Sequence, residues 1–316
     1  MLTKKKISVV PIAYKDEGNI VELYKRLTKV LKQITPNYEI IYVNDASPDN
    51  AHAVLAQAFK EDKRLVVITH SRNFGSQNVF TSGIMQCRSQ AVVLMDGDLQ
   101  DPPEMIPQFV HKWLEGYDVV YGVRKRRKSS LFLQVAYKFF YRIYRNLSYV
   151  QVPLDAGDFS LIDRRVADAL AAMPERDRFL RGLRAWVGFK QIGIPYTRQA
   201  RFSGESTNSL WDNIRWAKKG IFSLSFKPLE WISYVAATMV LISAVAIVLY
   251  LNFYFRYGAP PGFVTLLIVV LFLGGIQLLC FSVIAEYLAC IFQEVKQRPR
   301  FIVKGIDRHS DMDKTA

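Results

Sequence analysis

The stretch MDGDLQDPPE (95–104) places several carboxylates directly after the apolar run 91–94. Asp96 and Asp98 lie two residues apart, where a buried strand would end. Carboxylates repel one another and lose free energy when they leave water, so this pair needs a compensating partner. Mg²⁺ or Mn²⁺ is a suitable partner, because such ions take one or two protein carboxylates and complete their shell with water and phosphates. A solvated acidic turn is the alternative.

A metal held by this pair would neutralise a diphosphate leaving group as well as the carboxylates. The pair therefore predicts a substrate that carries a diphosphate, such as a nucleotide-sugar. The sequence contains neither G-x-G-x-x-G nor G-x-x-x-x-G-K-[ST], which disfavours dinucleotide and P-loop chemistry.

The elements that must position these residues alternate along the first part of the chain. We expect strands at 7–13, 38–44, 65–69 and 91–95, and helices at 20–33, 51–61 and 76–86. This alternation predicts an α/β fold, a mostly parallel sheet with helices on both faces. Ligands of such sheets bind outside the carboxyl ends of the strands. Polar motifs follow all four strands, at 14–17, 44–47, 71–75 and 96–98, which predicts one shared site.

Two stretches near the C-terminus are long and apolar enough to cross a bilayer as helices. Trp231–Phe255 has no charged residue and Phe263–Phe292 has only Glu286. The flanks outside this pair are basic, at 215, 218, 219 and 227 before it and at 296, 298, 300 and 304 after it. The positive-inside rule then predicts a hairpin with both termini cytoplasmic. No signal peptide is apparent, and three cysteines indicate no disulfide framework or metal cluster.

The formal net charge of +14 indicates acidic partners. Anionic lipid or a phosphorylated substrate is the favoured interpretation. We expect no nucleic-acid partner, because no matching fold motif accompanies the charge.

Together these motifs resemble glycosyltransferase family 2 enzymes of the type A fold. With the later Gly157-Asp158-Phe159 and the C-terminal hairpin, the chain is similar to the polyisoprenyl-phosphate glycosyltransferases within that family. The resemblance covers nearly the whole chain. It implies an inverting transferase that moves a hexose from a nucleotide-sugar to a polyprenyl phosphate at the cytoplasmic face of the plasma membrane.

The resemblance also assigns roles on the donor side. Asp96 and Asp98 correspond to the metal and diphosphate pair, with Gln100 as a further oxygen ligand. The residues that hold the nucleotide base and ribose correspond to Tyr14, Glu17 and Asp45. The chain departs from the family pattern nearby, since Pro11 lies three residues before Tyr14 instead of two and Lys15 replaces a usual Asn. The base contacts of this chain are therefore left open.

On the acceptor side, Arg124 and Arg127 of GVRKRRKSS correspond to the residues near the acceptor phosphate, which forked guanidinium groups suit. The aromatic and cationic stretch 130–149 suits a helix lying at the membrane interface, with a core helix as the alternative. Asp158 is the expected catalytic base, with Asp98 as the other catalytic carboxylate. An ionised phosphate acceptor needs less help from a base, so orienting the acceptor, approaching the metal and capping a helix are alternative roles for Asp158.

Arg201 begins RFSGES (201–206), which resembles a mobile loop that closes over the donor diphosphate. Relatives generally place Lys after that Ser, where this chain has Thr207. The segment 209–226 suits a helix on the membrane surface. The expected organisation is a cytoplasmic transferase domain (1–208), a juxtamembrane helix (209–230), two membrane helices (231–292) and a basic tail (293–316).

The expected reaction uses UDP-glucose as donor and undecaprenyl phosphate as acceptor. GDP-mannose and a UDP-aminoarabinose derivative are alternative donors, and a catalytically silent nucleotide-sugar sensor is an alternative function. A processive polysaccharide synthase is disfavoured, because the nearest match to its Q-x-x-R-W motif, at 297–301, follows the last span and ends in Phe. Self-association through the hairpin is a further expectation.

Overall fold

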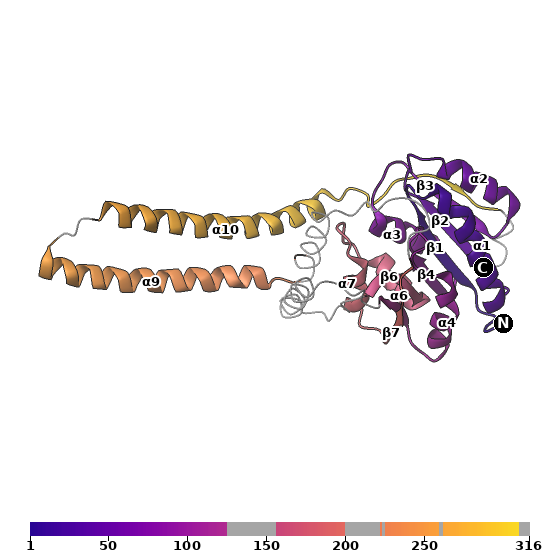
Figure 1. Ribbon diagram of the computed structural model, residues 1–316, viewed down its shortest axis with the longest axis horizontal. Helices are drawn as coiled ribbons and strands as arrows, with labels where there is room; N and C mark the ends of the chain where they lie inside the picture. The colour runs from indigo at the N-terminus through magenta and orange to yellow at the C-terminus, as the bar shows by residue number, and fades with distance from the viewer. Residues whose placement is uncertain (125–155, 200–221, 223–224, 259–261, 310–316) are drawn as a thin grey trace.

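The computed structural model describes residues 1–124, 156–199, 222, 225–258 and 262–309, and it contains an α/β domain joined to two long helices (Figure 1). The strands are β1 (Ile7–Ala13), β2 (Tyr38–Asn44), β3 (Leu65–His70), β4 (Ala91–Met95), β5 (Val119–Arg124), β6 (Ala156–Asp163), β7 (Gln191–Tyr196) and β8 (Val303–Asp307). They form one sheet in the order β7-β5-β6-β4-β1-β2-β3-β8.

The first four strands confirm the parallel sheet expected from the sequence. β1 pairs in parallel with β2 and β4, and β2 pairs in parallel with β3. Their residues are buried on both faces, which explains why β1, β2 and β4 have apolar residues in succession instead of alternating with polar ones. Parallel pairing places the carboxyl ends of all four strands at one edge of the sheet, as the shared site requires.

Helices cover both faces of this sheet. They are α1 (Glu17–Ile34), α2 (Ala51–Glu61), α3 (Ser76–Gln86), α4 (Ile106–Leu114), α6 (Arg164–Ala172) and α7 (Leu180–Trp186), with a short 3₁₀ turn, η1 (Pro103–Met105), before α4. α1, α2 and α4 pack on one face and α3, α6 and α7 on the other. On α1, Leu23, Leu27 and Leu31 are fully buried, at the spacing of one helix face.

β6 runs antiparallel between β4 and β5, and the sequence pattern did not predict this strand. Its register pairs Ala91 with Asp163 and Leu94 with Ser160. If both strands continue in this register, Asp158 comes opposite Asp96, two residues beyond the Leu94–Ser160 pair. The antiparallel strand therefore brings Asp158 to the edge where the acidic motif begins.

The two long helices are α9 (Lys227–Tyr257) and α10 (Phe263–Lys296), and they project away from the α/β domain (Figure 1). Both are long and apolar enough to cross a membrane, and the most apolar windows are not buried inside the protein. These properties fit the hairpin expected from the sequence. The expected spans, 231–255 and 263–292, fall within them.

After α10 the chain returns to the α/β domain and forms β8 at the edge of the sheet, antiparallel to β3. The sequence analysis predicted only a basic tail in this region. β8 covers the edge of β3, which would otherwise present unpaired backbone groups.

Candidate functional site

The acidic motif forms a tight turn at the carboxyl end of β4. Asp98 is 6% exposed and Asp101 is fully buried, whereas the Asp96 side chain is 32% exposed. A Cβ on Gly97 would lie 2.1 Å from the backbone oxygen of Ile12, so only glycine fits between the two aspartates. The backbone of Gln100 donates to Asp98 Oδ1 at 3.1 Å. The close approach of β1 thus explains the Asp-Gly-Asp spacing.

Side chains from β5 and β7 hold Asp101 in place. The hydroxyl of Tyr196, at the end of β7, donates to Asp101 Oδ1. Arg124 Nε donates in turn to the Tyr196 hydroxyl oxygen at 3.4 Å. A Cβ on Gly122 would lie 2.7 Å from the Tyr196 ring, so the glycine leaves the space that this ring fills. Two strands, β5 and β7, therefore position a carboxylate to which the sequence alone assigned no role.

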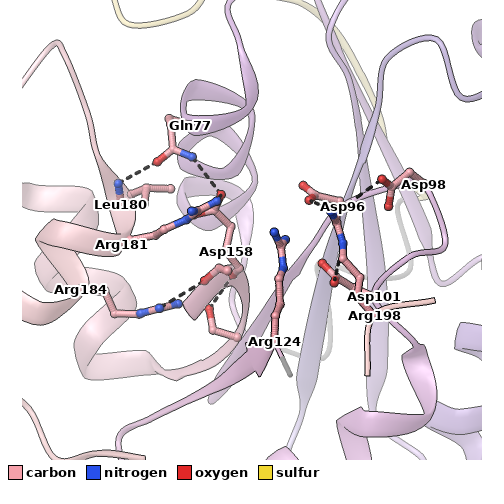
Figure 2. A network of polar contacts seen from close by, with 12 residues as sticks. Gln77, Asp96, Asp98, Asp101, Arg124, Asp158, Leu180, Arg181, Arg184 and Arg198 are labelled. Atoms are coloured by element: carbon pink, nitrogen blue, oxygen red, sulfur yellow. Dashed lines mark hydrogen bonds and ion pairs between the residues drawn. The ribbon is translucent and has the colours of Figure 1, made fainter. Parts of the chain in front are cut away.

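Arg198 lies among the three aspartates. Its Nη2 is 3.9 Å from Asp96 Oδ2 and 3.6 Å from Asp98 Oδ2, and its Nε is 3.7 Å from Asp101 Oδ1 (Figure 2). These distances are those of ion pairs, not hydrogen bonds. Among the described residues, Arg198 Nε and Asp101 Oδ2 are buried without a hydrogen-bond partner.

The cluster therefore has an excess of acidic oxygens. Burial, followed by repulsion from Asp101, Asp158 and Asp98, raises the pKa of Asp96. Water tempers this rise, because a third of the Asp96 side chain is exposed. The hard oxygen donors of Asp96 and Asp98, together with the repulsion that raises the pKa of Asp96, fit the binding of a divalent cation by this pair. Gln100 lies beside them, and its amide nitrogen donates to the Gln199 backbone oxygen at 3.3 Å.

Asp158 faces this cluster from β6, and its carboxylate is held by a two-pronged ion pair. Arg181 Nε donates to Asp158 Oδ1 at 3.0 Å, and Arg181 Nη2 donates to Oδ2 at 2.9 Å. The amide of Gln77, on α3, donates to Oδ2 at 3.3 Å and accepts from the Leu180 backbone at 2.7 Å. Gln77 therefore joins the start of α7 to the Asp158 carboxylate.

The charges around Asp158 determine its protonation. Burial alone would raise the pKa of Asp158, but Arg181, then Arg184 and Arg124, lower it below the ordinary value. Burial lowers the pKa of Arg184 to about 10, which leaves this side chain charged at neutral pH. Arg184 Nη2 donates to the Gly157 backbone oxygen at 3.3 Å. The group is therefore an ionised carboxylate surrounded by guanidinium groups.

Arg124 connects the two halves of the site. Figure 2 shows its side chain between Asp158 on one side and Asp96 and Asp101 on the other. Its guanidinium lies against Gly157, where a Cβ would meet Arg124 Nη2 at 3.1 Å. A cation at this position lies between the acidic cluster and Asp158.

The residues expected to hold the nucleotide lie in the loops after β1 and β2. Tyr14 is half-buried, and Glu17 Oε2 accepts from the Asn50 backbone at 2.6 Å, which joins the two loops. Asp45 is 2% exposed, and both of its oxygens accept backbone hydrogen bonds from the loop after β3. In this conformation the Asp45 carboxylate holds a neighbouring loop.

Backbone strain marks these same loops. Lys15, Ala46 and Leu99 have positive φ values of 58°, 52° and 57°. They follow β1, β2 and β4. Non-glycine residues rarely adopt this region, and such strain concentrates at ligand-binding sites. The strained positions therefore mark the same edge as the acidic motif.

Two expected site residues, Arg127 and Arg201, lie outside the described residues. The structure also brings together several residues that were not predicted from the sequence, namely Gln77, Arg181, Arg184, Tyr196 and Arg198. The spacing of Arg181 and Arg184, three apart in an otherwise mostly apolar segment, was the available signal, because it places both on one helix face. Arg198 had no comparable signal.

Known proteins resemble this chain over nearly its whole length. A family model described as glycosyl transferase family 2 matches residues 8–171. An uncharacterized glycosyltransferase of Bacillus subtilis, YkcC, is 40% identical over 94% of this chain and 92% of its own. One from Synechocystis is 38% identical over 95% of both chains. A prophage-derived bactoprenol glucosyl transferase of Shigella flexneri is 32% identical over 96% of this chain and 99% of its own. These matches extend through both long helices.

Proposed function

Because the chain belongs to glycosyl transferase family 2, we propose that it transfers glucose from UDP-glucose to the phosphate of undecaprenyl phosphate. The relatives named bactoprenol glucosyl transferases support glucose as the sugar and a polyprenyl carrier as the acceptor. α9 and α10 support a site that works at a membrane surface. The basic flanks of this pair favour the cytoplasmic face of the plasma membrane for the site and both termini.

One observation carries the proposal, namely two charged groups that face each other across Arg124. On one side lie three carboxylates suited to a metal-bound diphosphate, and on the other lies Asp158 with its guanidinium partners (Figure 2). A transfer between two phosphate-bearing substrates needs such a pair of sites, with the sugar between them. Mg²⁺ or Mn²⁺ held by Asp96 and Asp98, with Gln100 nearby, would neutralise the charge of the departing diphosphate.

In the proposed reaction, an oxygen of the lipid phosphate forms a bond to the anomeric carbon. The bond from that carbon to the diphosphate oxygen breaks, and UDP leaves with the electron pair. Attack from the opposite side inverts the α-linked donor to a β-linked product. Arg124 would steady the acceptor phosphate, and positioning and charge stabilisation supply most of the catalysis.

Asp158 has a role in this proposal that its partners define. A phosphate monoester loses its second proton near pH 6, so the acceptor is already a nucleophile at neutral pH. The pairing with Arg181 keeps Asp158 ionised, which a base requires, but it also lowers the affinity of Asp158 for a proton. We therefore assign Asp158 mainly to orienting the acceptor and its guanidinium partners.

The test is a donor panel with protein purified in detergent. UDP-glucose, GDP-mannose and a UDP-aminoarabinose derivative, each labelled in the sugar, are offered with undecaprenyl phosphate and Mg²⁺ or Mn²⁺, and EDTA serves as control. The expected product is a β-linked glucosyl lipid, identified by the anomeric proton coupling. A different labelled sugar would correct the donor, and nucleotide binding without any transfer would favour the sensor function.

A further inference from the structure

The segment that follows the second long helix reaches the donor side of the site. Its strand β8 pairs His70 of β3 with Val303, and the backbone of Ser71 donates to the Ile302 oxygen at 3.0 Å. The register shifts between Thr69 and His70, which marks a bulge at this end of the pair. Bulges at strand ends re-aim side chains and are frequent beside functional sites. β8 is thus joined to the point where β3 enters its loop.

Phe301, just before β8, stacks on the imidazole of His70. Their ring centroids lie 5.3 Å apart with planes 13° from parallel. Phe74 contacts the same imidazole with its edge, at 5.6 Å and 86°. His70 is 1% exposed, and its Nε2 has no hydrogen-bond partner among the described residues. Stacking by Phe301, the edge contact with Phe74 and one hydrogen bond at Nδ1 therefore restrain this ring.

That hydrogen bond leads to the donor loops. His70 Nδ1 lies 2.8 Å from Asp45 Oδ1. The Asp45 carboxylate accepts from the Phe74 backbone at 3.0 Å and from the Gly75 backbone at 2.8 Å. Gly75 has a φ of 85°, so this turn depends on a conformation that few residues adopt. The loop 71–75 is held by Asp45, Asp45 by His70, and His70 by Phe301.

We propose that Phe301 and His70 are positioning residues of the donor site, through which the segment after the membrane hairpin holds the loop 71–75 in place for the nucleotide. The nature of the ligand, a nucleoside diphosphate, rests on the proposed function. The contacts of Phe301 with His70 and of His70 with Asp45 are independent of the proposed function. The membrane hairpin is then connected to the donor site, because the segment that follows α10 contains Phe301, which holds His70.

The experiment uses the full chain in detergent and two readouts. Hydrogen exchange of a peptide covering 71–76 reports the loop, and titration with UDP or GDP reports the nucleotide site. Phe301→Ala removes the stacked ring, while His70→Phe keeps a ring for stacking and removes the bond to Asp45. Phe301→Tyr keeps an aromatic ring that can stack on His70. His309→Ala is the matched control, because His309 lies in the same segment but stacks on Phe59 of α2, at 4.0 Å.

In Phe301→Ala and His70→Phe we expect faster exchange of the loop peptide and about three- to tenfold weaker nucleotide binding. The KM for the donor should rise with little change in kcat. Phe301→Tyr and His309→Ala should behave as wild type. Wild-type exchange and affinity in both Phe301→Ala and His70→Phe would overturn the inference. If the wild-type protein bound neither nucleotide, the proposed function would fail, and the exchange data would still decide the inference.

Discussion

Arg181 donates two parallel hydrogen bonds to Asp158, from Nε at 3.0 Å and from Nη2 at 2.9 Å. This geometry is specific to arginine, since lysine carries a point charge without the planar fork. The pair makes the ionisation and the direction of Asp158 depend on a residue two elements away in the chain. A carboxylate held in this way is poorly suited to taking a proton and well suited to holding a cationic group in place.

The Arg181–Asp158 pair therefore predicts a shift in the pH dependence of activity. In the wild-type protein the guanidinium groups hold the pKa of Asp158 below its ordinary value. Asp158 is then ionised at and above the ordinary pKa of aspartate, and this charge is lost as the pH falls through the lowered value. In Arg181→Gln, burial should raise the pKa, so the acid limb of the kcat profile should move to higher pH. An unmoved acid limb in Arg181→Gln would contradict this role.

The Arg181–Asp158 pair also predicts that a positive charge without the planar guanidinium group cannot replace Arg181. Arg181→Lys should lower kcat by about tenfold, because the lysine cannot donate both parallel bonds. Measured kcat and KM for both substrates would locate the loss. Recovery of wild-type kcat by lysine would show that only the positive charge is needed.

Asp98 carries the prediction for the metal pair. Asp98→Ala should abolish sugar transfer while the protein remains folded in the membrane, because the variant would lose a proposed ligand of the cation that would neutralise the diphosphate. Asp168→Ala is a suitable control, since Asp168 is exposed and forms a helix-surface ion pair with Arg164. Transfer assays on membranes with matched protein content test both variants. Retained transfer by Asp98→Ala would remove the metal assignment.

The position of Arg198 predicts that its guanidinium group competes with a metal ion for the same carboxylates. Its guanidinium partly neutralises the carboxylates that would bind the metal, at distances of 3.6–3.9 Å. Arg198→Gln should therefore bind Mn²⁺ more tightly in the absence of nucleotide, by about three- to tenfold. Paramagnetic resonance of free Mn²⁺ measures this affinity directly. Equal or weaker Mn²⁺ binding by the variant would show that Arg198 does not occupy the cation position.

Lys15 predicts a gain in stability. Its φ of 58° costs a lysine roughly 1 kcal/mol or more, and asparagine tolerates this region better. Lys15→Asn should raise the midpoint of thermal unfolding by about 2 °C. Lys25→Asn, at an exposed position within α1, should lower it slightly through helix propensity. A lower midpoint for Lys15→Asn would indicate that the lysine makes a compensating contact.

The parts of the molecule that the sequence predicted share a local pattern. The bounds of β1, β2 and β4 agree with the expected strands, because these strands are mostly apolar runs followed by polar motifs. α1 begins at Glu17 instead of Ile20, since its first turn is polar and only the buried face has a readable period. Local patterns of this kind are sufficient to predict the layers of the fold and the edge of the sheet that holds the acidic motif.

What the sequence did not predict depends on contacts between distant segments. Asp158 comes to the edge that carries Asp96 because β6 inserts antiparallel beside β4, and no local period encodes that pairing. Arg181 reaches Asp158 through a helix of seven residues, too short for a periodic signal. β8 reads as a basic tail because three of its residues are charged or glycine, although backbone pairing with β3 makes it a strand.

The most direct test of the central claim compares two acceptors with one donor. Purified protein receives UDP-glucose labelled in the sugar, Mn²⁺, and either undecaprenyl phosphate or undecaprenol, and the label in the organic extract is counted. We predict label with the phosphate, none with the alcohol, and none with the phosphate after EDTA. Label transferred equally to the alcohol, or no transfer to the phosphate from any donor, would contradict the claim that two phosphate-bearing substrates meet at this site.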